Sequence, residues 1–225
     1  MKEKLFKLLP KYKIIPLVIL MLLNFAVYWG TKPINSGWYH YDLTIPLDDV
    51  IPVVPFFIVF YFLAYVQWVF GFIIIARENE ETCYRVVSGE LIAKLMCIVF
   101  FLAMPTMITR PEITGTGPFA FALRFLYKID VPNNLFPSIH CLESWLCFRF
   151  AWNLKKPPKW YRWLMLFISL NVFASVVFLK QHFFVDIIAG IAVAELGQLI
   201  SRITNSGRLL EKLNAAVFKT RNQES

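Results

Sequence analysis

Long apolar runs alternate with short polar segments along the chain, and most of these runs are long enough to cross a membrane. A membrane-spanning helix needs about 20 mostly apolar residues. The pattern predicts such helices over residues 14–30, 50–76, 91–109, 138–154, 163–179 and 184–201. A shorter apolar segment, 119–127, is predicted to lie along the membrane interface. We therefore expect an all-α polytopic membrane helix bundle of about six transmembrane helices, in a single domain over residues 1–225.

Composition agrees with a membrane protein. Hydrophobic residues make up 58% of the chain, and the charged share, 17%, equals the aromatic share. A soluble domain carries about 25% charged residues, so this chain has too few to cover a water-soluble surface. The four cysteines show no zinc or disulfide spacing, and we expect them in the core. No small-residue cleavage site follows the first apolar run, which is therefore predicted to be a retained helix.

The charged residues predict how the helices are oriented. The net charge is +8, a value that nucleic-acid-binding proteins also reach. However, the basic residues gather near the N-terminus, in the 155–162 hairpin and in the 203–225 segment, between or beyond the apolar runs. Because cytoplasmic ends of membrane helices are rich in Lys and Arg, we expect both termini in the cytoplasm and no nucleic-acid partner. Residues 203–225 would then form a basic cytoplasmic tail of a multi-pass plasma-membrane protein.

Three polar groups interrupt the apolar pattern. They are Arg110-Pro111, the segment 137–140, and the segment 180–182 with Asp186. The predicted topology places each group at the outer end of a span: the exit of the third, the entry of the fourth, and the junction of the fifth and sixth. Side chains at one depth on neighbouring helices can converge, so the three groups predict one site that faces outward.

The cationic and hydroxyl side chains of these groups suit an anion. Ser138 is predicted to stand at the start of a helix, where unpaired N–H groups and a hydroxyl can bind an anion. Arg110 offers a fork of donors that matches phosphate oxygens. Lys180 adds a point charge. These residues predict a phosphate-binding site.

The titratable side chains suit group transfer. His182 and Asp186 are four residues apart and would share one helix face. Asp186 can then hold the imidazole in one tautomer, which leaves the other nitrogen of His182 to act as nucleophile or base. His140 is suited to protonating a leaving oxygen.

The same residues resemble a known family. Phe136-Pro-Ser-Ile-His140 and His182-Phe-Phe-Val-Asp186 are similar to the second and third motifs of the type 2 phosphatidic acid phosphatase superfamily. Pro105-Thr106 with Arg110-Pro111 resembles the first motif, so the motifs lie within residues 105–190, in the order that the family has along six helices. The resemblance implies that His182 attacks phosphorus to form a phosphohistidine, that Asp186 orients it and that His140 protonates the leaving group. It also implies Arg110 and Ser138 as phosphate ligands and no metal or other cofactor.

Several positions depart from the family pattern. Ile139 stands where the second motif commonly has Gly, Ala103 where the first has Lys, and Val176 where the third has Arg. Two cationic phosphate ligands are therefore missing. The cations that could replace them are Lys180, Arg124 and Lys128. The pattern is nearer to the branch with sphingomyelin and inositol-phosphoceramide synthases, which transfer a phosphoryl head group to an alcohol.

We therefore expect a lipid phosphatase that hydrolyses a membrane lipid phosphate or pyrophosphate at the extracytoplasmic face. The alternatives are head-group transfer to an acceptor lipid, and a non-catalytic protein that binds or transports lipid phosphates. The identity of the lipid and the oligomeric state stay open.

Individual residues also have simpler interpretations. His140, His182 and Asp186 have side chains that could bind a metal, although no fourth ligand is obvious. Arg110 and Lys180 could anchor helix ends. Lys94 is expected to be an anchor at the cytoplasmic end of its helix. Glu143 is expected to hydrogen-bond within the bundle or to tune His140.

Overall fold

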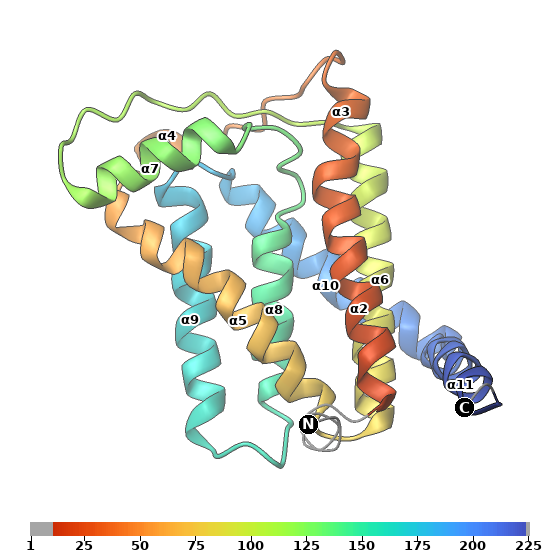
Figure 1. The fold of residues 1–225 in the computed structure, drawn as a ribbon. Helices are drawn as coiled ribbons and strands as arrows, with labels where there is room; N and C mark the ends of the chain where they lie inside the picture. The colour runs from red at the N-terminus through yellow and green to blue at the C-terminus, as the bar shows by residue number, and fades with distance from the viewer. Residues whose placement is uncertain (1–10, 224–225) are drawn as a thin grey trace.

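The computed structural model describes residues 11–223, and the described secondary structure is helical apart from two isolated β-bridges. Figure 1 shows the arrangement of the helices. In chain order they are α2 (Lys11–Phe25), the π-helix η1 (Ala26–Gly30), α3 (Thr31–Asn35), α4 (Pro46–Val50), the 3₁₀-helix η2 (Pro55–Phe57), α5 (Ile58–Ala76), α6 (Glu80–Ala103), α7 (Pro118–Ile129), α8 (Ile139–Ala151), α9 (Trp160–Phe178), α10 (Phe184–Thr204) and α11 (Gly207–Gln223).

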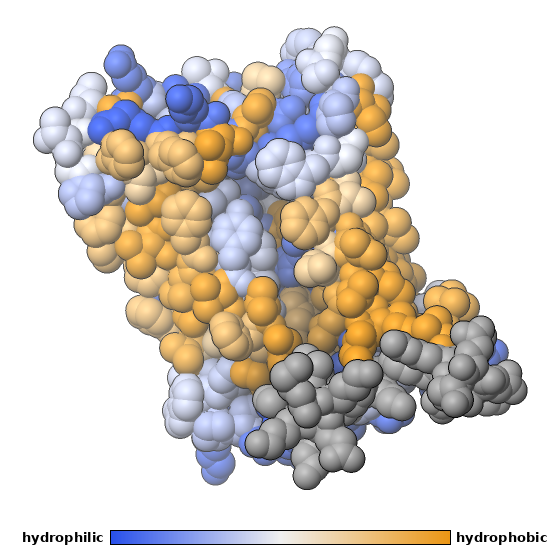
Figure 2. All heavy atoms as spheres, in the orientation of Figure 1, coloured by the Kyte–Doolittle hydropathy of each residue, from blue (hydrophilic) through white to orange (hydrophobic). Residues whose placement is uncertain are grey.

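Long apolar helices confirm the predicted polytopic bundle. In the described part of the chain, 5 helices are long and apolar enough to cross a membrane. These are Tyr12–Asn35, Pro55–Ala76, Glu80–Ala103, Trp160–Phe178 and Phe184–Thr204. On the face shown in Figure 2, hydrophobic residues cover the middle of the molecule and hydrophilic residues lie toward both ends.

The fourth predicted span, 138–154, is the exception to this pattern. It forms α8, which has 13 residues. At 1.5 Å per residue α8 is about 20 Å long, shorter than the bilayer core of about 30 Å. α8 packs against α5, α9 and α10 in the interior of the bundle, and Leu142, Leu146 and Cys147 are fully buried. Its first turn therefore begins inside the bundle, and the residues of that turn lie among the other helices.

The third span begins and ends earlier than the predicted 91–109. α6 begins after Asn79, whose side chain accepts a hydrogen bond from the Thr82 N–H at 2.8 Å and caps the helix. It ends at Ala103 because Pro105 disfavours the helical conformation of the residue before it. The exit of the third span is therefore not at Arg110, which lies beyond the helix in an extended segment.

Charged side chains inside α6 explain the wrong start of the third span. Lys94 was expected at the cytoplasmic end of its helix, but its side chain is 1% exposed and forms ion pairs with Glu90 at 3.3 Å and with Glu143 of α8. Its amine also donates a hydrogen bond to Asn24 of α2 at 2.8 Å. The anchor prediction for Lys94 is wrong. Glu143 makes the predicted hydrogen bond within the bundle, and its partner is Lys94.

The connections lie at the two ends of the bundle. α7 contains the predicted interfacial segment 119–127 and lies across one end of the bundle, above α5 and α9 in the view of Figure 1. Its Leu123 and Leu126 are buried, whereas Phe121 and Phe125 are exposed. The hairpin between α8 and α9 lies at the opposite end (Figure 1). The four cysteines are buried and unpaired, as expected.

Candidate functional site

His182 and Asp186 form a buried pair at the start of α10. The imidazole Nδ1 lies 3.0 Å from Asp186 Oδ2, and the side chain of Asp186 is completely buried, whereas His182 is 8% exposed. Asp186 Oδ2 also accepts the Phe183 N–H at 3.0 Å, as an acid in the first helical turn commonly does. The carboxylate therefore both caps α10 and fixes the orientation of His182. The Nε2 atom is left to face a substrate.

The turn between α9 and α10 fixes the backbone of His182. Lys180 adopts the left-handed conformation with φ 47°, which turns the chain sharply after α9. The N–H groups of Gln181 and His182 both donate to the Val176 carbonyl, at 2.9 and 3.1 Å. Val176, which replaces an arginine of the family pattern, thus contributes to the site through its main chain.

His140 lies opposite His182. The two ring centroids are 5.9 Å apart. The His140 ring stacks on Tyr61 of α5 at 4.5 Å and contacts the edge of Trp68 at 5.0 Å. Its Nε2 atom is buried and has no hydrogen-bond partner among the described residues. An imidazole held by aromatic rings with one unpaired nitrogen is available to a ligand between the two histidines.

The first turn of α8 is held against α10. Ser138 caps α8 by accepting the Cys141 N–H at 3.3 Å, and its own N–H donates to the Asp186 carbonyl at 3.2 Å. The helices approach closely at Gly190, where an added Cβ would lie 2.5 Å from the Ser138 carbonyl oxygen. Because Gly190 has no side chain, α8, which carries His140, can lie directly beside α10, which begins two residues after His182.

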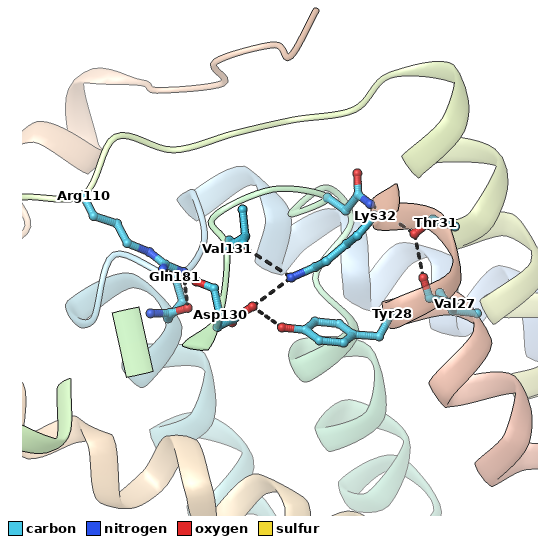
Figure 3. A network of polar contacts seen from close by, with 9 residues as sticks. Val27, Tyr28, Thr31, Lys32, Arg110, Asp130, Val131 and Gln181 are labelled. Carbon is cyan, nitrogen blue, oxygen red and sulfur yellow. Dashed lines mark hydrogen bonds and ion pairs between the residues drawn. The ribbon is translucent and has the colours of Figure 1, made fainter. Parts of the chain in front are cut away.

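Arg110 joins the site from the segment after α6. Its guanidinium donates to the Gln181 side-chain oxygen at 2.6 Å and to the Asp130 carbonyl at 2.5 Å, and it lies over the Tyr127 ring at 4.7 Å. Figure 3 shows Arg110 pointing toward Gln181 and Asp130. Arg110 therefore contacts Gln181, the residue immediately before the candidate nucleophile His182.

The first motif also shapes the approach to α8. Thr106 Oγ1 accepts the N–H groups of Leu135 and Phe136 at 2.9 and 3.0 Å, and the Thr106 carbonyl accepts the Asn134 N–H at 2.9 Å. Thr106 therefore holds the loop that leads directly into Ser138 and His140.

A cavity of about 480 Å³ joins these elements. It is lined by both histidines, by Gln181 and Asp130, and by aromatic residues that include Tyr28 and Tyr61. Its walls come from the first span on one side and from α5 on the other. Figure 2 shows a hollow between the hydrophobic surfaces of these two helices, with hydrophilic residues inside it. A second cavity, of about 630 Å³, is lined by residues of α6, α10 and α11 and includes neither histidine.

The other sequence-predicted residues lie outside this cavity lining. Lys180 donates to the Asp48 carbonyl at 2.6 Å. Ser138 is completely buried and is not a lining residue, although its neighbours Ile139 and His140 are. In the described part of the chain, no three His, Cys, Asp or Glu side chains converge as metal ligands, so the geometry gives no support to a metal site at the two histidines.

Asp130 is a site residue that the sequence pattern did not reveal. Its carboxylate accepts hydrogen bonds from the Tyr28 hydroxyl and from Lys32 at 2.9 Å. Burial alone would raise the pKa of Asp130, but Lys32 and Tyr28 outweigh burial and hold this pKa below its ordinary value. The only signal in the sequence was an acid in the short polar segment before Ser138. Tyr28 and Lys32 gave no signal because they are in the first span.

Comparison with known proteins agrees with the motifs. No curated protein and no solved structure matches this chain. A family model described as the PAP2 superfamily matches residues 40–200, which include every motif residue from Pro105 to Asp186. The chain therefore belongs to the PAP2 superfamily, the superfamily of the type 2 phosphatidic acid phosphatases, and its function is of the phosphatase type.

Proposed function

We propose that this protein hydrolyses a lipid phosphate or pyrophosphate at the extracytoplasmic face of the plasma membrane, through a phosphohistidine on His182. The observation that carries the proposal is the His182–Asp186 pair, which shares a cavity with the unpaired Nε2 of His140. A nucleophile, its orienting carboxylate and a second imidazole are the groups that a two-step phosphoryl transfer requires.

The phosphate would lie between the two histidines. Arg110 contacts Gln181, the residue before His182, and its guanidinium can turn from Gln181 to phosphate oxygens. The Ser138 hydroxyl accepts the Cys141 N–H but still has a hydrogen to donate. Lys180 can act as a ligand only after it leaves the Asp48 carbonyl. Such donors stabilise the charge that gathers on the phosphoryl oxygens in the transition state.

In the first step, His182 Nε2 attacks phosphorus and the bond from phosphorus to the lipid oxygen breaks. The negative charge of the bound phosphate favours protonated His140, which donates its proton to the leaving oxygen. Asp186 stabilises the positive charge that His182 acquires. In the second step, His140 accepts a proton from water, the water oxygen bonds to phosphorus, and the nitrogen–phosphorus bond breaks to release phosphate and free His182.

The cavity also suits a substrate that stays in the bilayer. Its aromatic lining residues Phe25, Trp29, Phe62 and Tyr65 have exposed side chains on the first span and α5. A lipid could enter between these helices with its phosphate toward the histidines and its tails among the aromatic side chains. The same lining favours the second candidate function, transfer of the phosphoryl head group to an acceptor lipid, because a second apolar alcohol could reach the phosphohistidine along this path.

The decisive experiment is phosphate release from a panel of lipid phosphates and pyrophosphates by purified protein in detergent, without added metal. The wild type should release phosphate and the His182→Ala variant should not. His40→Ala is the matched control, because His40 lies outside the cavity lining and should leave turnover unchanged. Acid-labile phosphate bound to the wild type but absent from His182→Ala would identify the intermediate.

Other outcomes separate the alternatives. A new phosphodiester lipid with no free phosphate would establish head-group transfer. Full phosphate release by His182→Ala would overturn the assignment of the nucleophile. Binding of lipid phosphates with no product from a folded protein would support the binding or transport alternative.

A further inference from the structure

The first span has a polar face that its apolar sequence does not reveal. Five polar side chains recur at helical spacing along it, and each forms a hydrogen bond with a side chain of another segment: Asn24, Tyr28, Thr31, Lys32 and Asn35. The π-helix η1 lies within this stretch, and π-turns inside helices often occur at functional sites. The first span therefore contributes more than a hydrophobic wall to the cavity.

Lys32 is the cation of this face, and although Lys32 itself is not among the residues that line the cavity, its amine contacts three residues that are. The amine is 2.9 Å from Asp130 Oδ1, 3.2 Å from the Val131 carbonyl and 4.2 Å from the centre of the Tyr28 ring. These three neighbours all line the cavity that includes both histidines. Figure 3 shows Lys32 and Arg110 approaching Asp130 from opposite sides. Lys32 and Arg110 both contact Asp130, so a substrate phosphate bound near Arg110 would have a second cation on the other side of Asp130.

The other basic residues near this end of the bundle have different surroundings. Lys180 donates to the Asp48 carbonyl. Arg124 donates to the carbonyls of Ile113 and Gly115 on the exposed surface. Lys128 is exposed on α7. The hydrogen bonds of Lys180 and Arg124 go to residues outside the cavity lining, whereas Lys32 binds the lining residues Asp130 and Val131. Lys32 is therefore better placed than these three to replace a cation missing at Ala103 and Val176.

We propose that Lys32 is a second cationic ligand of the substrate's phosphate, and that Asp130 holds its amine against the cavity lining while the site is empty. The proposal rests on the proposed function, because it takes a phosphate group as the ligand. When phosphate binds, the amine exchanges the Asp130 carboxylate for phosphate oxygens.

The surroundings of Asp130 make this exchange feasible. The Lys32 and Asp130 side chains are each 13% exposed, so an unpaired charge at either position would be costly. During the exchange, Lys32 passes from one anion to another, whereas Asp130 loses its cation and keeps the hydrogen bond from the Tyr28 hydroxyl. Asp130→Asn removes the cost of leaving this carboxylate without its cation. A phosphate also offers more negative charge and more acceptor oxygens than one carboxylate oxygen.

Two substitutions with opposite expected effects test the proposal. In Lys32→Met, the Michaelis constant for the lipid phosphate and the inhibition constant of inorganic phosphate should both rise, by about tenfold or more for the loss of a charged hydrogen bond. Lys32→Arg should recover most of the loss. Asp130→Asn should keep or strengthen phosphate binding, because it frees the amine. Lys159→Met, an exposed lysine at the other end of the bundle, is the charge-matched control and should behave as wild type.

A thermal shift caused by inorganic phosphate provides a second readout that needs no turnover. It should be present in the wild type and in Asp130→Asn, and Lys32→Met should need about tenfold more phosphate for the same shift. This holds even if no lipid phosphate is hydrolysed, so failure of the proposed function stays distinguishable. If Lys32→Met unfolds, the Lys32→Met/Asp130→Asn double variant removes the unpaired carboxylate and allows the same measurement. Equal stability loss in both single variants with unchanged phosphate constants would overturn the proposal and leave a structural ion pair.

Discussion

Replacement of Asp186 by asparagine separates two roles of this carboxylate, hydrogen bonding and charge. Asp186 Oδ2 accepts from both His182 and the Phe183 N–H, whereas Oδ1 has no partner among the described residues. An asparagine can place its oxygen at the Oδ2 position and keep both hydrogen bonds. Its amide nitrogen then takes the place of the unpaired Oδ1. Asp186→Asn therefore removes the charge and retains the cap of α10 and the orientation of His182.

The size of the effect follows from the distance between the two groups. His182 becomes positively charged when it attacks phosphorus, and the carboxylate lies 3.0 Å from its Nδ1. Two unit charges with centres about 4 Å apart interact by about 4 kcal/mol at an effective dielectric constant of about 20. Loss of this interaction in the transition state lowers the rate about a thousandfold. Asp186→Ala should be slower still, and it should also lose about 1 kcal/mol of stability with the cap.

The assay is kcat for phosphate release at saturating lipid phosphate, with thermal unfolding in the same detergent as the control for folding. Asp186→Asn should lose about three orders of magnitude in kcat and keep the wild-type unfolding temperature within a few degrees. A kcat within tenfold of wild type would refute the electrostatic argument. If the unfolding temperature of Asp186→Asn falls as far as that of Asp186→Ala, the asparagine does not preserve the two hydrogen bonds.

Two further predictions concern packing and buried charge. Gly190→Ala should lower activity and should lower stability by about 1–3 kcal/mol, because its Cβ would lie 2.5 Å from the Ser138 carbonyl oxygen. Gly117→Ala is the control, because an added Cβ there has no neighbour within 4 Å. Equal unfolding temperatures of the two variants would contradict the prediction. Lys94→Met should destabilise the fold by about 3–5 kcal/mol, measured by denaturation in detergent, because it leaves Glu90 and Glu143 buried without their cation. Replacing both acids by glutamine as well should restore much of the loss.

The apolar pattern predicted the bundle because helix length in a membrane is set by the bilayer. The boundaries failed where charge is buried inside a span. Glu90 delayed the predicted start of the third helix to residue 91, since the pattern cannot show that its charge is buried in an ion pair with Lys94, which also pairs with Glu143 of another helix. The predicted length of the fourth span was wrong, because the pattern cannot distinguish a helix that crosses the bilayer from a short helix that its neighbours bury, such as α8.

The candidate site was predictable where its residues are local in sequence. The spacing of four between His182 and Asp186 predicts a contact on a shared helix face. The contact exists, but the shared face is wrong, because His182 lies in the turn before α10, which begins at Phe184, and Asp186 reaches back to it from the first helical turn. The contacts of Asp130 were not predictable, because Tyr28 is 102 residues away in the chain. The π-helix between residues 26 and 30 changes the direction of side chains in the first span, and no pattern of apolar residues predicts it.

The first span therefore differs from the rest of the site in kind. In its most apolar stretch 22% of the residues are buried, compared with 33–50% in the other four long helices. The first span nevertheless lines the cavity and places Lys32 and Tyr28 beside Asp130. The match to the family begins at residue 40, after this span. Motifs shared across the family supply the histidine chemistry, but they cannot identify a phosphate ligand that lies before the shared region. The charge missing at Ala103 and Val176 is thus to be sought in the first span, where Lys32 contacts Asp130 and Val131 of the cavity lining.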